Sequence, residues 1–277
     1  MYIVVFAVVE LNDYVAFQNV EIIYDGASVL KDINTSFPEG KTTMIVGSSG
    51  SGKTSLLNCI NGKIKPNHGR VFVNSVDITQ IENKREYRKN IGMLFQKSGL
   101  FPDLTVSENV ALPYYEHYPN LKEDEINTLV KLKLQAVGLR GVYNKLPREL
   151  SGGMERRVAL ARAVALDPPL ILYDEPLTGQ DPISCGVLIS LMSALKNAYG
   201  ATSIIVSHQI KHLANHVDRI CVVGNNGIII NDDVDKVFAC KEPYVQQFLA
   251  GVPDGVVTFH YPAVDINDDL GLGELNA

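Results

Sequence analysis

Apolar residues recur along this chain with the spacings typical of strands and helices. Two short apolar runs within residues 15–37 flank Asp25 and Gly26, which predicts an N-terminal β-hairpin. Beyond residue 40, strand-like and helix-like runs alternate, which predicts an α/β core with a mainly parallel sheet. The predicted strands are 69–74, 91–96, 170–174, 202–206, 219–224 and 227–231, and the predicted helices are 152–166 and 184–198, with a strand, a loop and a helix over 41–62.

A helical block interrupts this alternation. Residues 105–146 carry apolar positions at helical spacing, which are Ile126, Leu129, Val130, Leu132 and Val137. We therefore expect a helical subdomain inserted between roughly residues 97 and 165. The tail is rich in Gly, Pro and Asp and shows no clear periodicity. We expect one domain over 1–250 and an extension outside its core over 251–277.

Composition narrows the functional classes. The 277 residues, 46% of them apolar and 20% charged, suffice for one large globular domain or two modest ones. The net charge of −6 argues against a nucleic-acid partner, because such proteins usually present a basic face. The four cysteines lack the spacing of a metal site, so we expect them to be reduced.

Membrane insertion is not expected from the sequence. No run approaches the roughly 20 apolar residues that span a bilayer. The apolar start at 1–11 lacks the preceding basic residue of a signal peptide, and we interpret it as an edge strand or as a start placed slightly upstream of the true one. Work at a membrane would therefore require a partner.

A phosphate-loop pattern, G-x-x-x-x-G-K-[ST], follows an apolar strand and opens a helix, which is the context that the motif requires. Glycines let successive backbone N–H groups point at phosphate oxygens, and the helix N-terminus adds partial positive charge. We predict that Lys53 contacts the β- and γ-phosphates of a nucleotide and that Thr54 coordinates Mg²⁺. The predicted binding residues are Gly47, Ser48, Ser49, Gly50, Ser51, Gly52, Lys53 and Thr54.

Two carboxylates, Asp174 and Glu175, follow the apolar run that begins at Leu170. A buried parallel strand that ends in acids places them at the carboxyl edge of the sheet, where ligands bind in open α/β folds. Asp174 is predicted to hold Mg²⁺, and Glu175 is predicted to be the general base that polarises the attacking water. The structural alternative is a helix cap beside a solvated glutamate.

Three further residues are candidates for the same site. His208 follows a core strand and could sense the γ-phosphate, while Gln96 ends another strand and its amide could touch Mg²⁺ or the attacking water. Tyr24 precedes the phosphate loop and could stack on a base. For each of the three, an ordinary structural role is the alternative.

A second anion-binding pattern, LSGGM, lies at the predicted start of the helix over 152–166. Ser151 can cap that helix, and Gly152 and Gly153 can supply N–H donors.

These motifs, in their order along the chain, resemble the ATPase subunits of ATP-binding-cassette (ABC) transporters. They are Tyr24, GSSGSGKT, Gln96, LSGGM, LILYDE, Asp181 and His208. The resemblance covers nearly the whole chain, and LSGG distinguishes this family from other phosphate-loop ATPases. It implies a phosphate-loop ABC ATPase domain with a mainly parallel core sheet, an N-terminal antiparallel β-subdomain and an inserted α-helical subdomain, with ATP and Mg²⁺ as cofactors.

The resemblance also implies a second copy of the chain as partner. In the family, two subunits pair head to tail, and each nucleotide lies between the phosphate loop of one subunit and the LSGG turn of the other. Ser151, Gly152, Gly153 and Asp181 would then contribute to a shared nucleotide site, and ATP would hold the dimer together.

Four local segments narrow the resemblance to one branch. The segments LFQKSGLF, SGGMERRVALARA, DEPLTGQDPIS and GVPDG are similar to ATPases of the Mla (maintenance of lipid asymmetry) system and of MCE-type lipid transporters. Met154 and Gln180 depart from the Gln and Leu that are common in the wider family, and they favour this branch. It implies ATP-driven movement of phospholipids between the inner and outer membranes of diderm bacteria.

That branch implies several partners. One is a membrane permease that docks near Leu100 and Phe101 and holds the chain at the cytoplasmic face of the inner membrane. The others are MCE-type substrate-binding subunits and small regulatory subunits. The tail at 251–277, through VPDG and FHYPA, would contact the neighbouring subunit.

Three alternatives remain open. An importer ATPase for amino acids or metals would share the fold, although Met154 and Gln180 argue against it. An ABC ATPase that acts on DNA or ribosomes usually carries tandem cassettes or a coiled-coil insertion, whereas this chain has one phosphate loop and no sustained heptads. A phosphate-loop kinase would not need the LSGG turn or a glutamate directly after Asp174.

Overall fold

The computed structural model describes residues 13–253, 255–257, 264 and 266–270. The chain divides into two compact units, one that ends at Val237 and one that begins at Phe238. The predictions for residues 1–11 and for the FHYPA segment at 259–263 lie outside the described residues.

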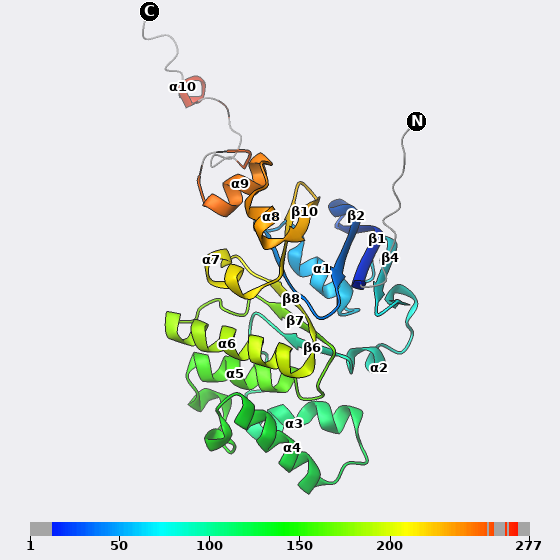
Figure 1. The fold of residues 1–277 in the computed structure, drawn as a ribbon, viewed down its shortest axis with the longest axis vertical. Helices are drawn as coiled ribbons and strands as arrows, with labels where there is room; N and C mark the ends of the chain where they lie inside the picture. The colour runs from blue at the N-terminus through cyan, green and yellow to red at the C-terminus, as the bar shows by residue number, and fades with distance from the viewer. Residues whose placement is uncertain (1–12, 254, 258–263, 265, 271–277) are drawn as a thin grey trace, which may run out of the picture. The chain divides into compact units, whose positions relative to one another are not determined.

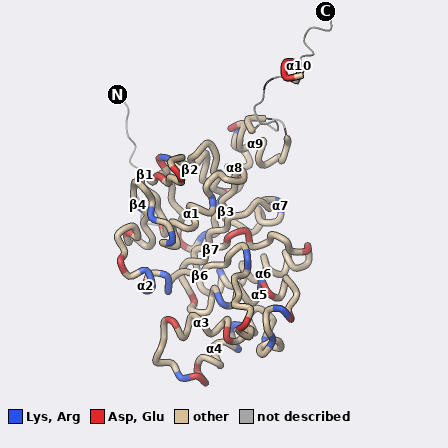
Figure 2. The backbone as a smooth tube through the Cα atoms, turned by 180° about the vertical axis from the view of Figure 1, so that it is seen from behind, with Lys and Arg blue, Asp and Glu red and all other residues tan. Residues whose placement is uncertain are grey.

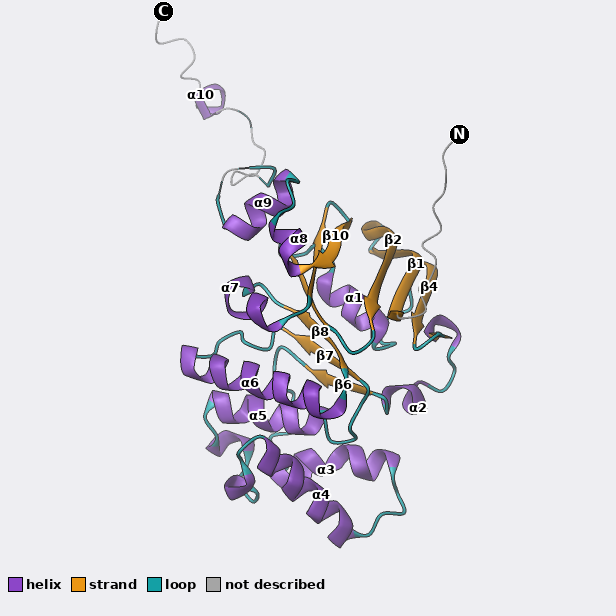
Figure 3. Cartoon of the chain, viewed as in Figure 1, coloured by secondary structure: helices purple, strands orange, loops and turns teal. Residues whose placement is uncertain are grey.

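A six-stranded sheet forms the centre of the first unit, in the order β10-β9-β3-β8-β7-β6 (Figure 1, Figure 3). Neighbouring strands are parallel except β9 and β10, which form an antiparallel hairpin. The predicted, mainly parallel core is therefore confirmed. The strands are β3 (Thr42–Gly47), β6 (Ile91–Leu94), β7 (Leu170–Asp174), β8 (Thr202–Val206), β9 (Arg219–Gly224) and β10 (Gly227–Asp233).

An antiparallel sheet in the order β2-β1-β4-β5 confirms the predicted N-terminal β-structure. Its strands are β1 (Asp13–Tyr24), β2 (Ala27–Pro38), β4 (His68–Val73) and β5 (Val76–Asp77). Asp25 and Gly26 connect the first two strands with φ of 49° and 79°, and positive φ at both turn residues suits the twist of a tight hairpin.

Helices occur where the sequence predicted them, and α2 and α8 occur in addition. They are α1 (Lys53–Ile60), α2 (Lys84–Arg88), α3 (Val106–His117), α4 (Glu123–Ala136), α5 (Gly152–Ala163), α6 (Pro182–Tyr199), α7 (Ile210–Leu213) and α8 (Val234–Phe238), with 3₁₀ turns at Ile78–Gln80, Arg140–Val142, Pro147–Glu149 and Ala214–His216. The second unit contains α9 (Pro243–Ala250) and α10 (Ile266–Asp269).

The core joins both sheets through α1. Leu56, Leu57 and Ile60 of this helix are fully buried in the same apolar cluster as Phe17 and Phe37. The two phenylalanine rings meet edge to face, with centroids 6.2 Å apart. The helix that follows the phosphate loop is therefore held on both sides.

Every residue of β3, β7 and β8 is buried, as expected for parallel strands that are covered on both faces. Because these strands run in the same direction, their carboxyl ends lie along one edge of the sheet. This edge carries the residues of the candidate site.

Some predicted boundaries shift. The strand predicted over 91–96 ends at Leu94, because the next residues are exposed and their carbonyls bond to α5. The helix predicted over 152–166 ends at Ala163, before Asp167 adopts a left-handed φ of 51°. The helix predicted over 184–198 begins earlier, at Pro182, since Asp181 caps it.

One apolar residue of the helical block is not part of the core. Leu132 is 60% exposed, although it is one of the apolar positions at helical spacing that predicted this helix. Leu132 lies six positions after the buried Ile126, which at 3.6 residues per turn places it about 120° around the helix from that residue and off the buried face. Lys133 and Leu134 are buried instead, and the Lys133 ammonium pairs with Asp167.

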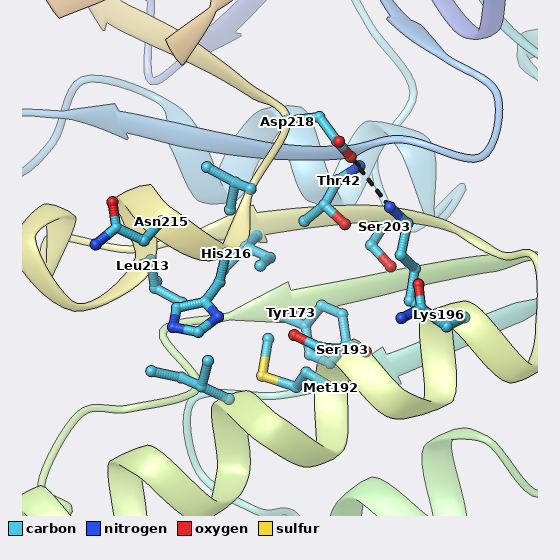
Figure 4. Close-up of a pocket in the computed structure, with 14 residues that line it drawn as sticks. Thr42, Tyr173, Met192, Ser193, Lys196, Ser203, Leu213, Asn215, His216 and Asp218 are labelled. Carbon is cyan, nitrogen blue, oxygen red and sulfur yellow. Dashed lines mark hydrogen bonds and ion pairs between the residues drawn. The ribbon is translucent and has the colours of Figure 1, made fainter. Parts of the chain in front are cut away.

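A cavity of about 290 Å³ separates α6 from the sheet and from the segment that contains α7 (Figure 4). Lys196 Nζ lies 3.1 Å from Asp218 Oδ2, which also accepts a 2.7 Å bond from the Thr42 amide. Burial opposes the ionisation of Asp218, but these bonds hold its pKa below the usual value. This ion pair therefore connects α6 to the first residue of β3 across the cavity.

The register of α4 makes a testable prediction. Leu134→Ala should lower the free energy of unfolding by about 2–5 kcal/mol, because it empties a fully buried site. Leu132→Ala makes the same chemical change at an exposed site of the same helix and should change it by no more than about 0.5 kcal/mol. Urea denaturation of both variants measures the difference, and equal losses would refute this register.

Candidate nucleotide-binding site

The loop between β3 and α1 requires glycine at two positions. Gly52 has a φ of 97°, and a Cβ added there would lie 2.7 Å from the Leu30 side chain. A Cβ at Gly47 would lie 2.2 Å from the Val223 carbonyl oxygen. The backbone thus makes a tight turn against neighbouring strands and leads into the N-terminus of α1, where anions bind favourably.

Lys53 lies inside this loop. Its Nζ donates to the carbonyls of Gly47 and Ser48 at 2.9 and 2.7 Å. Burial lowers the pKa of Lys53, while Glu175 and Asp174 act to raise it. Ser51 Oγ is buried and finds no hydrogen-bond partner within the described part of the chain. An anion in the loop would satisfy both groups, so the loop suits a phosphate.

Asp174 and Thr54 meet at the end of β7. The Thr54 hydroxyl donates to Asp174 Oδ1 at 3.3 Å. Burial raises the pKa of the Asp174 carboxyl, and the Thr54 hydrogen bond opposes that shift. A carboxylate and a hydroxyl are hard oxygen ligands of the kind that Mg²⁺ prefers. The pair therefore fits the predicted metal role next to the phosphate loop.

Glu175 turns away from the strand with a φ of 47°, which is uncommon for a residue with a side chain. Its Oε2 accepts a 3.2 Å hydrogen bond from Thr178. Its Oε1 lies 3.2 Å from His208 Nε2, within ion-pair distance but without the alignment of a hydrogen bond. The structure thus brings together the predicted base and the predicted γ-phosphate sensor.

Tyr24 lies beside the phosphate-loop helix, and Gln96 lies beyond the end of β6. Tyr24 is 42% exposed, and its hydroxyl accepts a 3.5 Å bond from Ser55 of α1, so its ring stands beside the phosphate-loop helix. Gln96 is exposed two residues beyond the end of β6, and its carbonyl accepts a hydrogen bond from Arg156.

The LSGG turn belongs to a different part of the unit. Ser151 caps α5 through the Met154 amide at 3.3 Å, and α5 packs against α3, α4, α6 and β6. The phosphate loop follows β3, which is three strands away from β6 in the sheet, or roughly 14 Å. One chain thus presents the two anion-binding patterns apart from each other.

Gly153 and Asp181 have close partners within the chain. A Cβ at Gly153 would lie 2.6 Å from Ser184 Oγ and 3.5 Å from Gln180 Oε1. Asp181 accepts 3.0 Å hydrogen bonds from the amides of Ile183 and Ser184. The glycine therefore lets the LSGG turn pack closely on the start of α6, and Asp181 has a capping role there.

Sequence reasoning missed Arg156, which is only 7% exposed and binds the carbonyls of Phe95 and Gln96. An arginine in a helix next to other charged residues reads as a solvated position. The signal that could have found it is its spacing of three and four residues from the apolar Ala159 and Leu160, which places Arg156 on a buried face of α5.

Comparisons with known proteins decide the family. The family model described as ABC transporter matches residues 30–178. A protein of Escherichia coli strain K12, the intermembrane phospholipid transport system ATP-binding protein MlaF, is 44% identical over 244 residues, which are 87% of this chain and 90% of the relative. The chain belongs to the ABC transporter ATPase family. It is thus an ATP-binding subunit with the ATPase fold of that family.

Two further proteins are less similar to this chain. The methionine import ATP-binding protein MetN of Carboxydothermus hydrogenoformans is 35% identical over 239 residues, covering 84% of this chain and 70% of the relative. Among solved structures, the dimeric ATP-binding cassette MJ0796 bound to ADP and phosphate superposes with a TM-score of 0.73 at 30% identity, covering 79% of this chain and 98% of that one.

No helix in the described ranges of this ABC ATPase is both long enough and apolar enough to cross a membrane.

Proposed function

We propose that this ABC ATPase powers the movement of phospholipids between two membranes. The main support is its 44% identity over nearly full length to an intermembrane phospholipid transport ATPase, against 35% to a methionine import ATPase. Met154 and Gln180 favour the same choice of cargo. The chain itself supplies nucleotide chemistry, and the lipid is handled by its partners.

The residues at the edge of the sheet have separate roles in the binding and hydrolysis of ATP. The phosphate-loop amides and Lys53 hold the β- and γ-phosphates, and Thr54, Asp174 and Gln96 hold Mg²⁺. When bound, Mg²⁺ neutralises phosphate charge during transfer. Glu175 accepts hydrogen-bond donation from the attacking water and polarises it, and His208, 3.2 Å away, contacts the γ-phosphate.

Two copies complete the site. Ser151, Gly152 and Gly153 contact the nucleotide held by the partner's phosphate loop, with Asp181 beside them. The separation of the two anion-binding patterns within one chain supports this arrangement, and so does the dimeric state of the MJ0796 cassette. ATP then joins the two copies, and loss of the γ-phosphate releases them, which turns binding energy into a conformational cycle.

A pair of variants tests these roles. Glu175→Gln should bind ATP but lose turnover by a factor of about 10² or more, because it removes the general base, and it should form a stable ATP-bound dimer. Adding Ser151→Arg should abolish that dimer while the monomer still binds ATP. Light scattering and fluorescent-nucleotide titration measure both, and normal turnover by Glu175→Gln would disprove its role as base.

The permease is proposed to dock in a groove of about 550 Å³ next to α2 and α3. Phe101 lines this groove and is 55% exposed, whereas Leu100 is half-buried outside its lining. Arg88 of α2 and Lys89, which follows that helix, also line it, and Figure 2 shows the basic residues of the helix. An apolar floor with a basic margin suits a short amphipathic helix of a membrane subunit. Docking there would hold the chain at the cytoplasmic face of the inner membrane. The same assembly would contain MCE-type substrate-binding subunits and small regulatory subunits.

Co-purification tests the cargo. A tagged chain isolated from membranes in mild detergent should bring down a permease, an MCE-type subunit and phospholipid. Phe101→Asp should lower the yield of permease by about tenfold or more, since a desolvated charge is costly in an apolar contact. Leu132→Asp, at another exposed apolar site, serves as the control. Recovery of an amino-acid permease instead would refute the lipid assignment.

The extension is proposed to contact the neighbouring subunit. In the second unit, Val257 is paired with Gln247 of α9 by two hydrogen bonds of 2.8 Å, so residues near 255–257 are folded back onto a helix. A structured extension of this kind can present a surface to a partner.

Truncation tests the extension. Removal of residues 251–277 should weaken the ATP-bound dimer of Glu175→Gln several-fold at equal protein concentration while ATP binding by the monomer stays unchanged. Gln247→Ala, which removes the paired hydrogen bonds, should give a smaller loss of the same kind. An unchanged dimer after truncation would exclude this contact.

A further inference from the structure

Two arginines of α5 point at the backbone that follows β6. Arg156 donates to the Phe95 carbonyl at 2.6 Å and to the Gln96 carbonyl. Arg162 donates to the carbonyls of Gly99 and Ser98 at 2.8 and 3.0 Å. Together with a hydrogen bond from the Ser98 hydroxyl to Glu155, these bonds hold every residue of the segment 95–99 except Lys97.

This arrangement is a costly way to hold a loop. The guanidinium of Arg156 is buried, and Arg162 is half-buried, so both charges are partly withdrawn from water. Apolar packing could fasten a loop to a helix without burying charge. A guanidinium, however, binds two neighbouring carbonyls in a fixed geometry, which sets the orientation of the peptide as well as its position.

Arg156 also reaches a third part of the site. Its Nη2 lies 3.5 Å from the Thr178 carbonyl, and the Thr178 hydroxyl donates to Glu175. The same side chain therefore touches the segment of Gln96 and the turn after Glu175, from a helix whose first residues are the LSGG glycines.

We propose that Arg156 is a positioning residue that joins the backbone of Gln96 to the LSGG helix. Gln96 then keeps its position relative to α5. A displacement of the groove lined by Phe95, Gly99 and Arg162 therefore moves Gln96 and α5 together. The inference rests on the role proposed for Gln96 at the nucleotide, and the held segment itself can be examined without nucleotide.

Limited trypsin digestion examines the segment directly. Lys97 is exposed and lies within the held segment, so cleavage after it requires that segment to open locally. Without nucleotide, Arg156→Met should be cut after Lys97 about tenfold faster than the unchanged chain, as identified by fragment mass. Arg140→Met, an exposed arginine elsewhere in the helical block, should leave the rate unchanged. Equal rates for Arg156→Met and the unchanged chain would overturn the proposal.

A double-mutant cycle separates positioning from simple loss of stability. Gln96→Ala and Arg156→Met should each lower kcat by roughly 10–100-fold, as expected for a ligand and the residue that orients it. ATP affinity at the phosphate loop should not change. The double variant should be no slower than Gln96→Ala alone, because Arg156 acts through Gln96. Losses that multiply would overturn the proposal.

A third variant protects the test against misfolding. Arg156→Lys keeps the charge but not the fork, and it should lie between the unchanged chain and Arg156→Met in both measurements. If Arg156→Met does not fold, the lysine variant replaces it, and unchanged values for that variant would overturn the proposal. If the chain without substitutions fails to hydrolyse ATP, that result would count against the proposed function. The digestion would still show whether Arg156 holds the segment 95–99.

Discussion

The parallel pairing of β3, β8 and β7 is the constraint on which the site depends. Val206 pairs with Ile45 on one side and with Asp174 on the other, so the three strands reach the edge of the sheet in one row. The phosphate loop begins two residues after Ile45, and His208 stands two residues after Val206. A shift of one residue in either pairing would turn Asp174 to the other face of the sheet and separate it from Thr54.

Charge balance then holds the site in a state that suits ligands. Lys53 and Asp174 are both buried, and burial moves the pKa of each toward its neutral form. The attraction between the two charges opposes this shift in both groups, whereas the Glu175 carboxylate opposes it at Lys53 and adds to it at Asp174. A phosphate beside Lys53 and a cation beside Asp174 would each supply the missing opposite charge, so the binding of nucleotide and of metal support one another.

The helical block is connected to the nucleotide site through α5. Its α5 carries the LSGG turn at one end and, along its length, the arginines that hold the segment after β6. Gly153 packs on the start of α6, close to Gln180. Gln180, which distinguishes this branch in the sequence, thus lies close to Gly153 of the LSGG motif. The helical block is attached to the rest of the unit at the loop after β6 and at the turn after β7.

The motif residues, the order of strands and helices and the family were predictable from the sequence, because phosphate loops, acid-ended strands and LSGG turns are local patterns whose chemistry dictates residue type and spacing. Leu132 and the end of the strand at Leu94 were not, since burial depends on which helix face meets α3 and α5 and on where Arg156 finds its carbonyls. The contact between Glu175 and His208 likewise needed the tertiary structure, because the two residues are brought together by the pairing of β7 with β8 and by the positive φ of Glu175. Local patterns specify chemistry, and the packing between elements far apart in the chain specifies which of those groups can meet.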